Sequence, residues 1–320
     1  MEIPIIDFQK CGLMYKNDNE IEESSFIEIG EKLFKAFSTS GFAYITNHGI
    51  PDQVINEANK VSDDFFATSL EYKMKFCSKS TGVCYDPIES VNTNLERPAD
   101  FVEGLRLPSS SEFNEWPDIE NLNHTVDTMQ KLCKTLTLRI FKALGRGMKL
   151  KNKDLFFESH NLIGKKGNQT LLKLLHYPPL VGAVLKKNQL RCGEHADIGS
   201  LTILFQDDLG GLQVQTPGGE FIDAHPIPGT ALLNIGDMLQ FWCGKRLKST
   251  VHRVILPTEP SIKSQVRRCL AYFGFVDDDV LLSELEFEDS VSNTNIKTEK
   301  RMTSYEYWNE RFAAHFFKEK

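Results

Sequence analysis

The spacing of apolar residues along the chain changes character near residue 170. Before this point apolar side chains recur every three or four positions, which is the period of an amphipathic helix packed on one face. Glycine and proline punctuate these segments, and Gly145 is placed to cap the end of the last one. The elements expected in this part are helices over 23–38, 51–65 and 124–144 and short strands over 3–8 and 42–49.

After residue 170 the pattern becomes one of short apolar stretches separated by turn sequences such as DDLGG (207–211) and TPGG (216–219). Closely spaced strands of this kind favour a sandwich or a barrel over a sheet with alternating helices. Near the C-terminus, Thr303 and Glu306 have the spacing of a capping box and predict a final helix. The expected strands are 171–177, 201–206, 212–216, 220–226, 230–236, 249–256 and 267–276.

The composition is that of an ordinary globular protein and excludes several classes of partner. Of 320 residues, 41% are hydrophobic and 25% are charged, which is enough apolar material for a sizeable core. The net charge of −7 would repel phosphate backbones, so we expect no nucleic acid partner. No segment has the pattern of a signal peptide or a membrane helix, and the seven cysteines form no CxxC pair. We therefore expect a cytoplasmic monomer with reduced cysteines and no membrane contact.

Polar residues with metal-binding side chains stand directly before one of the apolar strands. His195 and Asp197 precede 201–206 and are two positions apart, so on a strand their side chains leave the same face. His252 lies in a later strand of the same β region and could supply a third ligand. Two imidazoles and one carboxylate can occupy one face of an octahedron, the arrangement of non-haem iron(II) oxygenases. A polar pair that caps a strand, or a zinc hydrolase site, would use the same residue types.

A second set of polar residues lies in and beside the last predicted strand. Arg267 shares a face with Cys269 and Phe273, whereas Arg268 points the other way. A buried guanidinium requires an anion, and it can bind a carboxylate through two hydrogen bonds. Tyr177, which precedes two prolines, could add a further hydrogen bond to the same anion. These residues predict a site for a carboxylate-bearing co-substrate, unless the arginine reaches solvent at a strand edge and the tyrosine is a core residue.

Taken together, these motifs resemble the 2-oxoglutarate/iron(II)-dependent oxygenase superfamily, in the branch that includes isopenicillin N synthase and the plant flavonoid and gibberellin oxygenases. The resemblance spans nearly the whole chain. IPIIDF, GFAYITNHGIP and FFATSLEYKMKF look like the family's N-terminal region. HADIGSLTILFQDDLGGLQV, GTALLNIGDMLQFWCGKRLKSTVHRV and RRCLAYF look like its catalytic core. The resemblance implies an α+β fold built on a double-stranded β-helix, the jelly-roll or cupin-like barrel, flanked by helices.

The resemblance also implies roles for individual residues. His195, Asp197 and His252 match the family's iron ligands. Arg267 matches the arginine that binds the distal carboxylate of 2-oxoglutarate, and Tyr177 matches the second tyrosine of the family's NYYPP stretch, which touches the same carboxylate. The implied cofactors are Fe(II), 2-oxoglutarate and O2. The implied reaction is hydroxylation or desaturation of a small organic molecule, with release of succinate and CO2.

Two departures from the family pattern bear on co-substrate binding. Cys269 stands where the family has the serine of Arg-x-Ser, and a thiol is a weaker hydrogen-bond donor than a hydroxyl. Leu175 replaces the asparagine of NYYPP and removes another polar contact. These changes leave two alternatives open. One is an oxidase of the isopenicillin N synthase type, which does not use 2-oxoglutarate, and the other is a non-catalytic relative that only binds a ligand.

The resemblance further divides the chain into three regions of one compact unit. These are an N-terminal oxygenase region over 1–120, the Fe(II)/2-oxoglutarate jelly-roll core over 168–276 and a C-terminal helical extension over 277–320, packed on the core. Phe273 matches a position that often lines the substrate pocket in the family. Phe101 lies in a segment that commonly covers the mouth of the pocket. Both are therefore candidate substrate-contacting residues.

Overall fold

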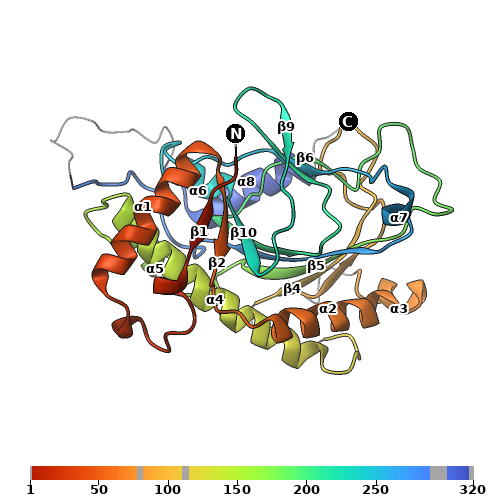
Figure 1. The fold of residues 1–320 in the computed structure, drawn as a ribbon, viewed down its shortest axis with the longest axis horizontal. Helices are drawn as coiled ribbons and strands as arrows, with labels where there is room; N and C mark the ends of the chain where they lie inside the picture. Colours follow the sequence, from red (N-terminus) through yellow and green to blue (C-terminus); the bar gives the residue numbers. More distant parts are fainter. Residues whose placement is uncertain (1, 78–81, 110–114, 289–300, 317–320) are drawn as a thin grey trace.

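Two β-sheets packed face to face form the centre of the molecule (Figure 1). The computed structural model describes residues 2–77, 82–109, 115–288 and 301–316. The fold is α+β with a jelly-roll centre, as expected. The larger sheet has the order β1 (Ile5–Asp7), β2 (Phe42–Thr46), β10 (Thr230–Ile235), β7 (Leu201–Gln206), β12 (Arg267–Gly274), β5 (Leu171–Tyr177), β4 (Glu103–Pro108) and β3 (Cys84–Asp86). The smaller sheet has the order β6 (Cys192–His195), β11 (His252–Val254), β8 (Leu212–Gln215) and β9 (Phe221–Asp223).

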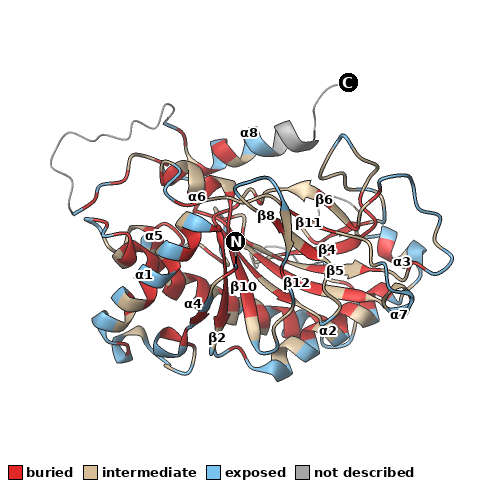
Figure 2. Ribbon diagram, turned by 45° about the horizontal axis from the view of Figure 1, so that its top comes forward, coloured by how far each residue is buried: buried red, intermediate tan, exposed pale blue. Residues whose placement is uncertain are grey.

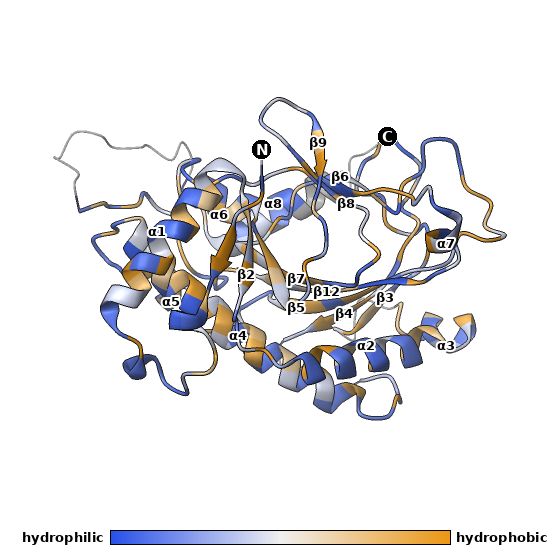
Figure 3. Ribbon diagram, in the orientation of Figure 1, coloured by the Kyte–Doolittle hydropathy of each residue, from blue (hydrophilic) through white to orange (hydrophobic). Residues whose placement is uncertain are grey.

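Long helices cover the outer face of the larger sheet. Figure 2 shows buried residues along the strands and on the sides of these helices that face the sheet. In Figure 3 hydrophobic and hydrophilic residues alternate around α2, as expected of an amphipathic helix. The long helices are α1 (Glu23–Thr39), α2 (Asp52–Phe66) and α4 (Leu122–Gly147). The shorter ones are α3 (Leu70–Met74), α5 (Leu155–Glu158), α6 (Asp237–Trp242), α7 (Pro260–Lys263) and α8 (Ser304–Phe316), with 3₁₀ turns at Gln9–Cys11 and Asp18–Glu20.

Residues of the larger sheet alternate between two separate hydrophobic cores. In β12, Leu270 and Tyr272 belong to the core shared with the helices, whereas Cys269 faces the smaller sheet. In β5, Leu174 joins the helical core and Tyr177 joins the core between the sheets. The side chains predicted to bind ligands therefore point into the space between the two sheets, because the strand period separates them from the helix-packing residues.

The N-terminal region and the jelly-roll core share one sheet. All four of β1, β2, β3 and β4 come from residues 1–120, and β2 and β4 pair with β10 and β5 of the core. The strands β3 and β4 were not predicted from the sequence. The sheet thus crosses from one region to the other, which accords with a single compact unit, while the boundaries at 120, 168 and 276 stay predictions.

Of the two helix termini predicted from the sequence, one is confirmed and the other is wrong. The capping box at the start of α8 is present, since Thr303 N donates to Glu306 Oε2 at 2.8 Å and Glu306 N donates to Thr303 Oγ1 at 3.2 Å. The prediction that Gly145 ends its helix is wrong, because α4 continues to Gly147 and is followed by Met148 as its C-cap.

The glycines near the end of α4 allow close packing rather than termination. A β-carbon at Gly147 would lie 2.0 Å from the carbonyl carbon of Gly30, and one at Gly145 would lie 2.3 Å from Lys153 O. The helices α1 and α4 therefore meet backbone to backbone at Gly30 and Gly147. A glycine inside a helix costs about 0.5–1 kcal/mol, and this contact offsets that cost.

Replacing Gly147 with alanine should lower the free energy of unfolding by about 1–3 kcal/mol, because the added methyl group forces α1 and α4 apart. Urea denaturation followed by circular dichroism measures the change. Gly218→Ala is the matched control, since the nearest atom to a β-carbon at Gly218 is 3.6 Å away. Equal stability of the two variants would show that the contact between the helices is not tight.

Candidate metal centre and substrate pocket

Three side chains with metal-binding atoms meet between the two sheets. His195 Nε2 and His252 Nε2 each lie 3.8 Å from Asp197 Oδ1, and the three ligand atoms are all within 4.8 Å of one another. Atoms that each lie about 2.1 Å from one ion are about 3–4 Å apart, depending on the ligand angle. In the part of the chain that the structure describes, no other group of His, Cys, Asp and Glu side chains comes together in this way.

The HxD pair bridges the two sheets. His195 ends β6 in the smaller sheet, where it pairs directly with His252 of β11. Asp197 lies beyond the end of that strand, in the turn that leads to β7 of the larger sheet. The expectation that both residues lie on one strand is therefore wrong for Asp197. The chain changes sheets between them, and this turn brings the carboxylate to the imidazoles.

Backbone carbonyls orient both imidazole rings. His195 Nδ1 lies 2.9 Å from Gly193 O, and His252 Nδ1 lies 3.1 Å from Thr250 O. A carbonyl oxygen can only accept, so each Nδ1 carries the proton and donates it. In the neutral form of each ring, Nε2 then presents a lone pair toward Asp197, and this is the form of histidine that binds a metal.

Two residues that sequence reasoning missed hold the carboxylate of Asp197. Thr202 Oγ1 and Asn234 Nδ2 both donate to Asp197 Oδ2 at 2.6 Å. Because Oδ2 is fully engaged, Oδ1 is the oxygen left for a metal. Asn234 could have been noticed as a lone polar residue in the apolar strand TALLNI, whereas nothing marks Thr202 in its own strand.

The electrostatics of the triad differ between its two histidines. Burial by itself would raise the pKa of Asp197, but the His252 and His195 rings and the two hydrogen bonds to Oδ2 hold it below its usual range. Burial, together with the neighbouring His195 ring, lowers the pKa of His252 to about 4. The carboxylate is thus ionised and the His252 ring is neutral at neutral pH. Burial by itself would also lower the pKa of His195, but Cys192, Asp197 and the bond to Gly193 O raise it to about 10, so metal binding would release a proton from this ring.

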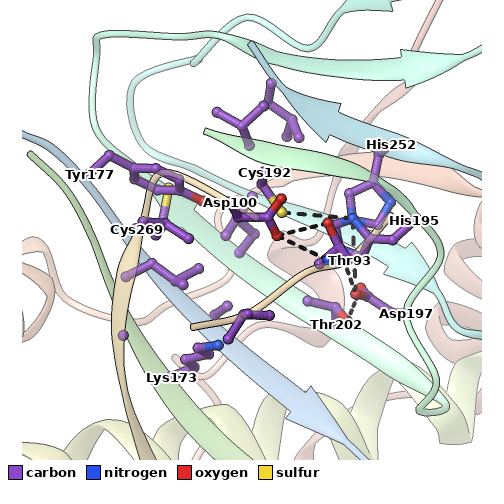
Figure 4. Close-up of a pocket in the computed structure, with 18 of the residues that line it drawn as sticks. Thr93, Asp100, Lys173, Tyr177, Cys192, His195, Asp197, Thr202, His252 and Cys269 are labelled. Atoms are coloured by element: carbon purple, nitrogen blue, oxygen red, sulfur yellow. Dashed lines mark hydrogen bonds and ion pairs between the residues drawn. The ribbon is translucent and has the colours of Figure 1, made fainter. Parts of the chain in front are cut away.

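A buried cation lies in the same cavity as the triad. Arg267 of β12 and Tyr177 of β5 are register partners, and the guanidinium carbon lies 4.7 Å from the tyrosine ring centre. Arg267 is 1% exposed, and its Nε donates to Gly210 O at 2.6 Å, but its Nη1 is buried without a partner. Figure 4 shows Tyr177 and Cys269 at one end of the pocket and the triad at the other. A free N–H on a buried guanidinium is what a bound carboxylate would satisfy.

The other candidate residues differ in whether their side chains line the cavity. Cys269 and Phe273 line the cavity, as do the three triad residues and Arg267 and Tyr177. Phe101 is buried but does not line the cavity, whereas its neighbours Asp100 and Val102 do. The side chain of Phe101 therefore packs away from the cavity wall that Asp100 and Val102 help to form.

The residues present fit a metal and a dicarboxylate together. The donor set of two imidazole nitrogens and one carboxylate oxygen, all on one side, suits Fe(II) with positions left open. The unpartnered Nη1 of Arg267 suits a carboxylate elsewhere in the same cavity. One molecule that carries a chelating group and a distal carboxylate could use both ends.

Known proteins resemble the chain along nearly its whole length. Residues 168–275 match the model of the 2OG-Fe(II) oxygenase superfamily, and residues 3–127 match the model described as non-haem dioxygenase in morphine synthesis N-terminal. The 2-oxoglutarate-dependent dioxygenase htyE of Aspergillus rugulosus is 32% identical, over 79% of this chain and 83% of the relative. The proline hydroxylase buaE of Petromyces alliaceus is 30% identical, over 96% and 97%. A full-length protein of Neurospora crassa, whose crystal structure was solved in complex with alpha-KG and thymine, is 29% identical, with a TM-score of 0.83 over 98% of this chain and 97% of that one.

Proposed function

The chain belongs to the 2-oxoglutarate/Fe(II) oxygenase superfamily, and on this premise we propose a role for each residue of the site. The protein is a 2-oxoglutarate-dependent dioxygenase that uses Fe(II), 2-oxoglutarate and O2 to oxidise a small molecule. His195, Asp197 and His252 hold the metal. Arg267 and Tyr177 bind the distal carboxylate of 2-oxoglutarate, with Cys269 beside them. The reaction we propose is hydroxylation, as in the relative named a proline hydroxylase.

The observation that carries this proposal is the division of one cavity into two complementary ends. Two free Nε2 atoms and Asp197 Oδ1 meet at one end, and a buried guanidinium with an unpartnered N–H lies at the other. A zinc hydrolase would account for the first end but gives no reason for the second. An additional buried cation is costly unless an anion binds it.

The residues of the chain bind and orient the metal and the co-substrate, and the metal supplies the reactivity. When bound, Fe(II) supplies the oxygen chemistry, in which 2-oxoglutarate is decarboxylated to succinate and CO2 as the substrate is oxidised. Arg267 anchors the distal carboxylate and so sets the direction of the co-substrate along the cavity. Thr202 and Asn234 keep Asp197 turned with Oδ1 toward the two imidazoles. Apolar side chains such as Leu204, Leu212 and Val254 line part of the cavity, and such walls limit the access of water to reacting groups.

Oxygen-dependent turnover of the purified protein tests the reaction. The protein is incubated with Fe(II), 2-oxoglutarate and a panel of small polar molecules, and succinate and oxidised product are quantified together. We expect succinate and product in equal amounts with a substrate from the panel. Product without succinate would indicate an oxidase of the isopenicillin N synthase type instead. Binding without either product would indicate a protein that only holds its ligand.

One wall of the cavity indicates the class of substrate. Lys173 Nζ and Arg106 Nη2 both pair with Asp86, at 2.9 and 2.7 Å, so two cations share one carboxylate. Lys173 lines the cavity with Phe273. It can extend there because Gly104 has no side chain, since a β-carbon would lie 2.6 Å from Lys173 Cε. We propose a small polar substrate whose carboxylate or carbonyl oxygen accepts a hydrogen bond from Lys173, while its apolar part packs against Phe273.

Replacing Lys173 with methionine should raise KM for the substrate identified in the panel about 10- to 150-fold, the equivalent of one charge-assisted hydrogen bond of about 1.5–3 kcal/mol. The fold should be kept, because Asp86 retains Arg106 as its partner. Steady-state kinetics measures KM, and calorimetry should show unchanged binding of 2-oxoglutarate. The control is Lys186→Met, which removes a lysine that pairs with Glu89 at 2.6 Å and does not line the cavity. An unchanged KM in Lys173→Met would rule out the contact.

The cellular location, the oligomeric state and the absence of a nucleic acid partner are proposed from the composition. No helix in the described part of the chain has the length and apolar character needed to cross a membrane. We propose that the protein acts as a cytoplasmic monomer with no nucleic acid partner, which its net charge of −7 favours. Light scattering of the purified protein tests the monomeric state.

A further inference from the structure

Arg191, which directly precedes β6, is a buried cation with unsatisfied hydrogen-bond donors. Its side chain is among the largest fully buried ones, with 1% exposure. Its Nε and Nη2 atoms have no hydrogen-bond partner among the described residues. A buried N–H without an acceptor is costly, and on a charged group the cost is larger.

A third fully buried arginine shows how a structural guanidinium is satisfied in this protein. Arg139 of α4 donates from Nε to Asp18 at 2.9 Å, and its two terminal nitrogens donate to the carbonyl oxygens of Gly12 and Tyr15 at 2.5 and 2.7 Å. Arg191 has no such set of partners. It shares its unsatisfied state with Arg267, whose Nη1 is also buried and unpartnered. The two side chains therefore resemble each other and differ from the structural arginine.

Arg191 and Arg267 lie around the same tyrosine. Their guanidinium carbons are 5.8 and 4.7 Å from the centre of the Tyr177 ring. The nearby carboxylate, Asp207, already accepts hydrogen bonds from the backbone N–H groups of Arg268 at 2.5 Å and Leu209 at 3.2 Å. The cavity contains the carboxylate of Asp100, which accepts hydrogen bonds from Gly193 N and Thr93 Oγ1, both at 2.8 Å. Neither carboxylate satisfies the unpartnered N–H groups of Arg191 and Arg267.

We propose that Arg191, which does not itself line the cavity, is a positioning residue whose charge beside Tyr177 strengthens the binding of the distal carboxylate of 2-oxoglutarate by Arg267 and Tyr177. The inference rests on the proposed roles of Arg267 and Tyr177 in that site. It also accounts for the two departures from the family pattern, because Cys269 and Leu175 each provide less hydrogen bonding than the serine and asparagine that they replace. A second guanidinium restores the attraction for the anion that these replacements remove.

The test compares two co-substrates that differ only in the distal carboxylate region. Anaerobic calorimetry of the Mn(II)-loaded protein measures Kd for 2-oxoglutarate and for 2-oxobutyrate, which chelates the metal in the same way but has no distal carboxylate. Arg191→Gln should weaken 2-oxoglutarate binding about 10- to 100-fold and leave 2-oxobutyrate binding unchanged. Arg191→Lys, which keeps the charge, should lie between the wild type and Arg191→Gln.

Control measurements separate the inference from a structural role and from the proposed function. The unfolding temperature without co-substrate shows whether each variant folds, and the increase in that temperature on adding 2-oxoglutarate gives a second measure of binding. Equal weakening of both co-substrates, or no weakening of either, would overturn the role of Arg191. Absence of 2-oxoglutarate binding to the wild-type protein would overturn the proposed roles of Arg267 and Tyr177 as well.

Discussion

Replacing Asp197 with alanine should lower turnover on the order of a thousand-fold or more and abolish tight binding of Fe(II). Asp197 supplies the anionic ligand of the triad, and without it only two imidazole ligands remain. A bound metal contributes several kcal/mol to stabilisation of the transition state, and each 1.36 kcal/mol is a factor of about ten in rate. Metal content after dialysis and the rate of succinate formation measure the two effects.

A neighbouring carboxylate provides the control for this variant. Asp208 is exposed, follows β7 and does not line the cavity, so Asp208→Ala should keep both metal and activity. The unfolding temperature of the metal-free Asp197→Ala protein shows whether the fold survives the loss of the acceptor for Thr202 and Asn234. A folded Asp197→Ala protein that retained iron and turnover would refute the metal assignment.

Replacing Arg267 with glutamine should weaken 2-oxoglutarate binding by about 2–5 kcal/mol, which corresponds to roughly 30-fold to several thousand-fold in Kd. The loss is large because the distal carboxylate would be left buried without its main counter-charge. Binding of Mn(II) in the absence of 2-oxoglutarate should be unchanged, since Arg267 does not contact the triad. Calorimetry with the metal alone, and then with 2-oxoglutarate, separates these two equilibria.

The adjacent arginine is a close control. Arg268 differs by one position in β12, and its Nε binds Asp63 of α2 on the opposite side of the sheet. Arg268→Gln should therefore keep wild-type affinity for 2-oxoglutarate and lose only a partly exposed ion pair, worth about 0–1 kcal/mol of stability. If Arg268→Gln weakened the co-substrate and Arg267→Gln did not, the assignment of the two faces of the strand would be reversed.

The direction of these two arginines could be predicted because it depends on one strand alone. A β-strand sends successive side chains to opposite faces, so Arg267, Cys269 and Phe273 had to share a face once the stretch was recognised as a strand. The short apolar stretches of the sequence likewise predicted β5 at 171–177 and β7 at 201–206, as the structure has them. The positions of His195, Asp197 and His252 could be identified because few residue types bind Fe(II), and their motif resembles that of a known family.

The groups that support the triad could not be predicted in this way. Thr202 comes from β7 and Asn234 from β10, and they meet Asp197 because β7 and β10 are neighbours in the larger sheet. The carbonyls that orient the two histidines depend on the local path of the backbone in the folded chain. The path of Lys173 into the cavity depends on Gly104, which lies in β4, a strand that the sequence did not predict.

The sequence by itself determined which residue types are available and how they alternate along each strand and helix, because φ and ψ preferences and hydrophobic periodicity act within one element. Only the tertiary structure decided that the HxD turn passes from the smaller sheet to the larger one. Only the tertiary structure placed Arg191 and Arg267 around one tyrosine. Such contacts join segments far apart in the chain, and they depend on strand order and packing that no local stretch encodes.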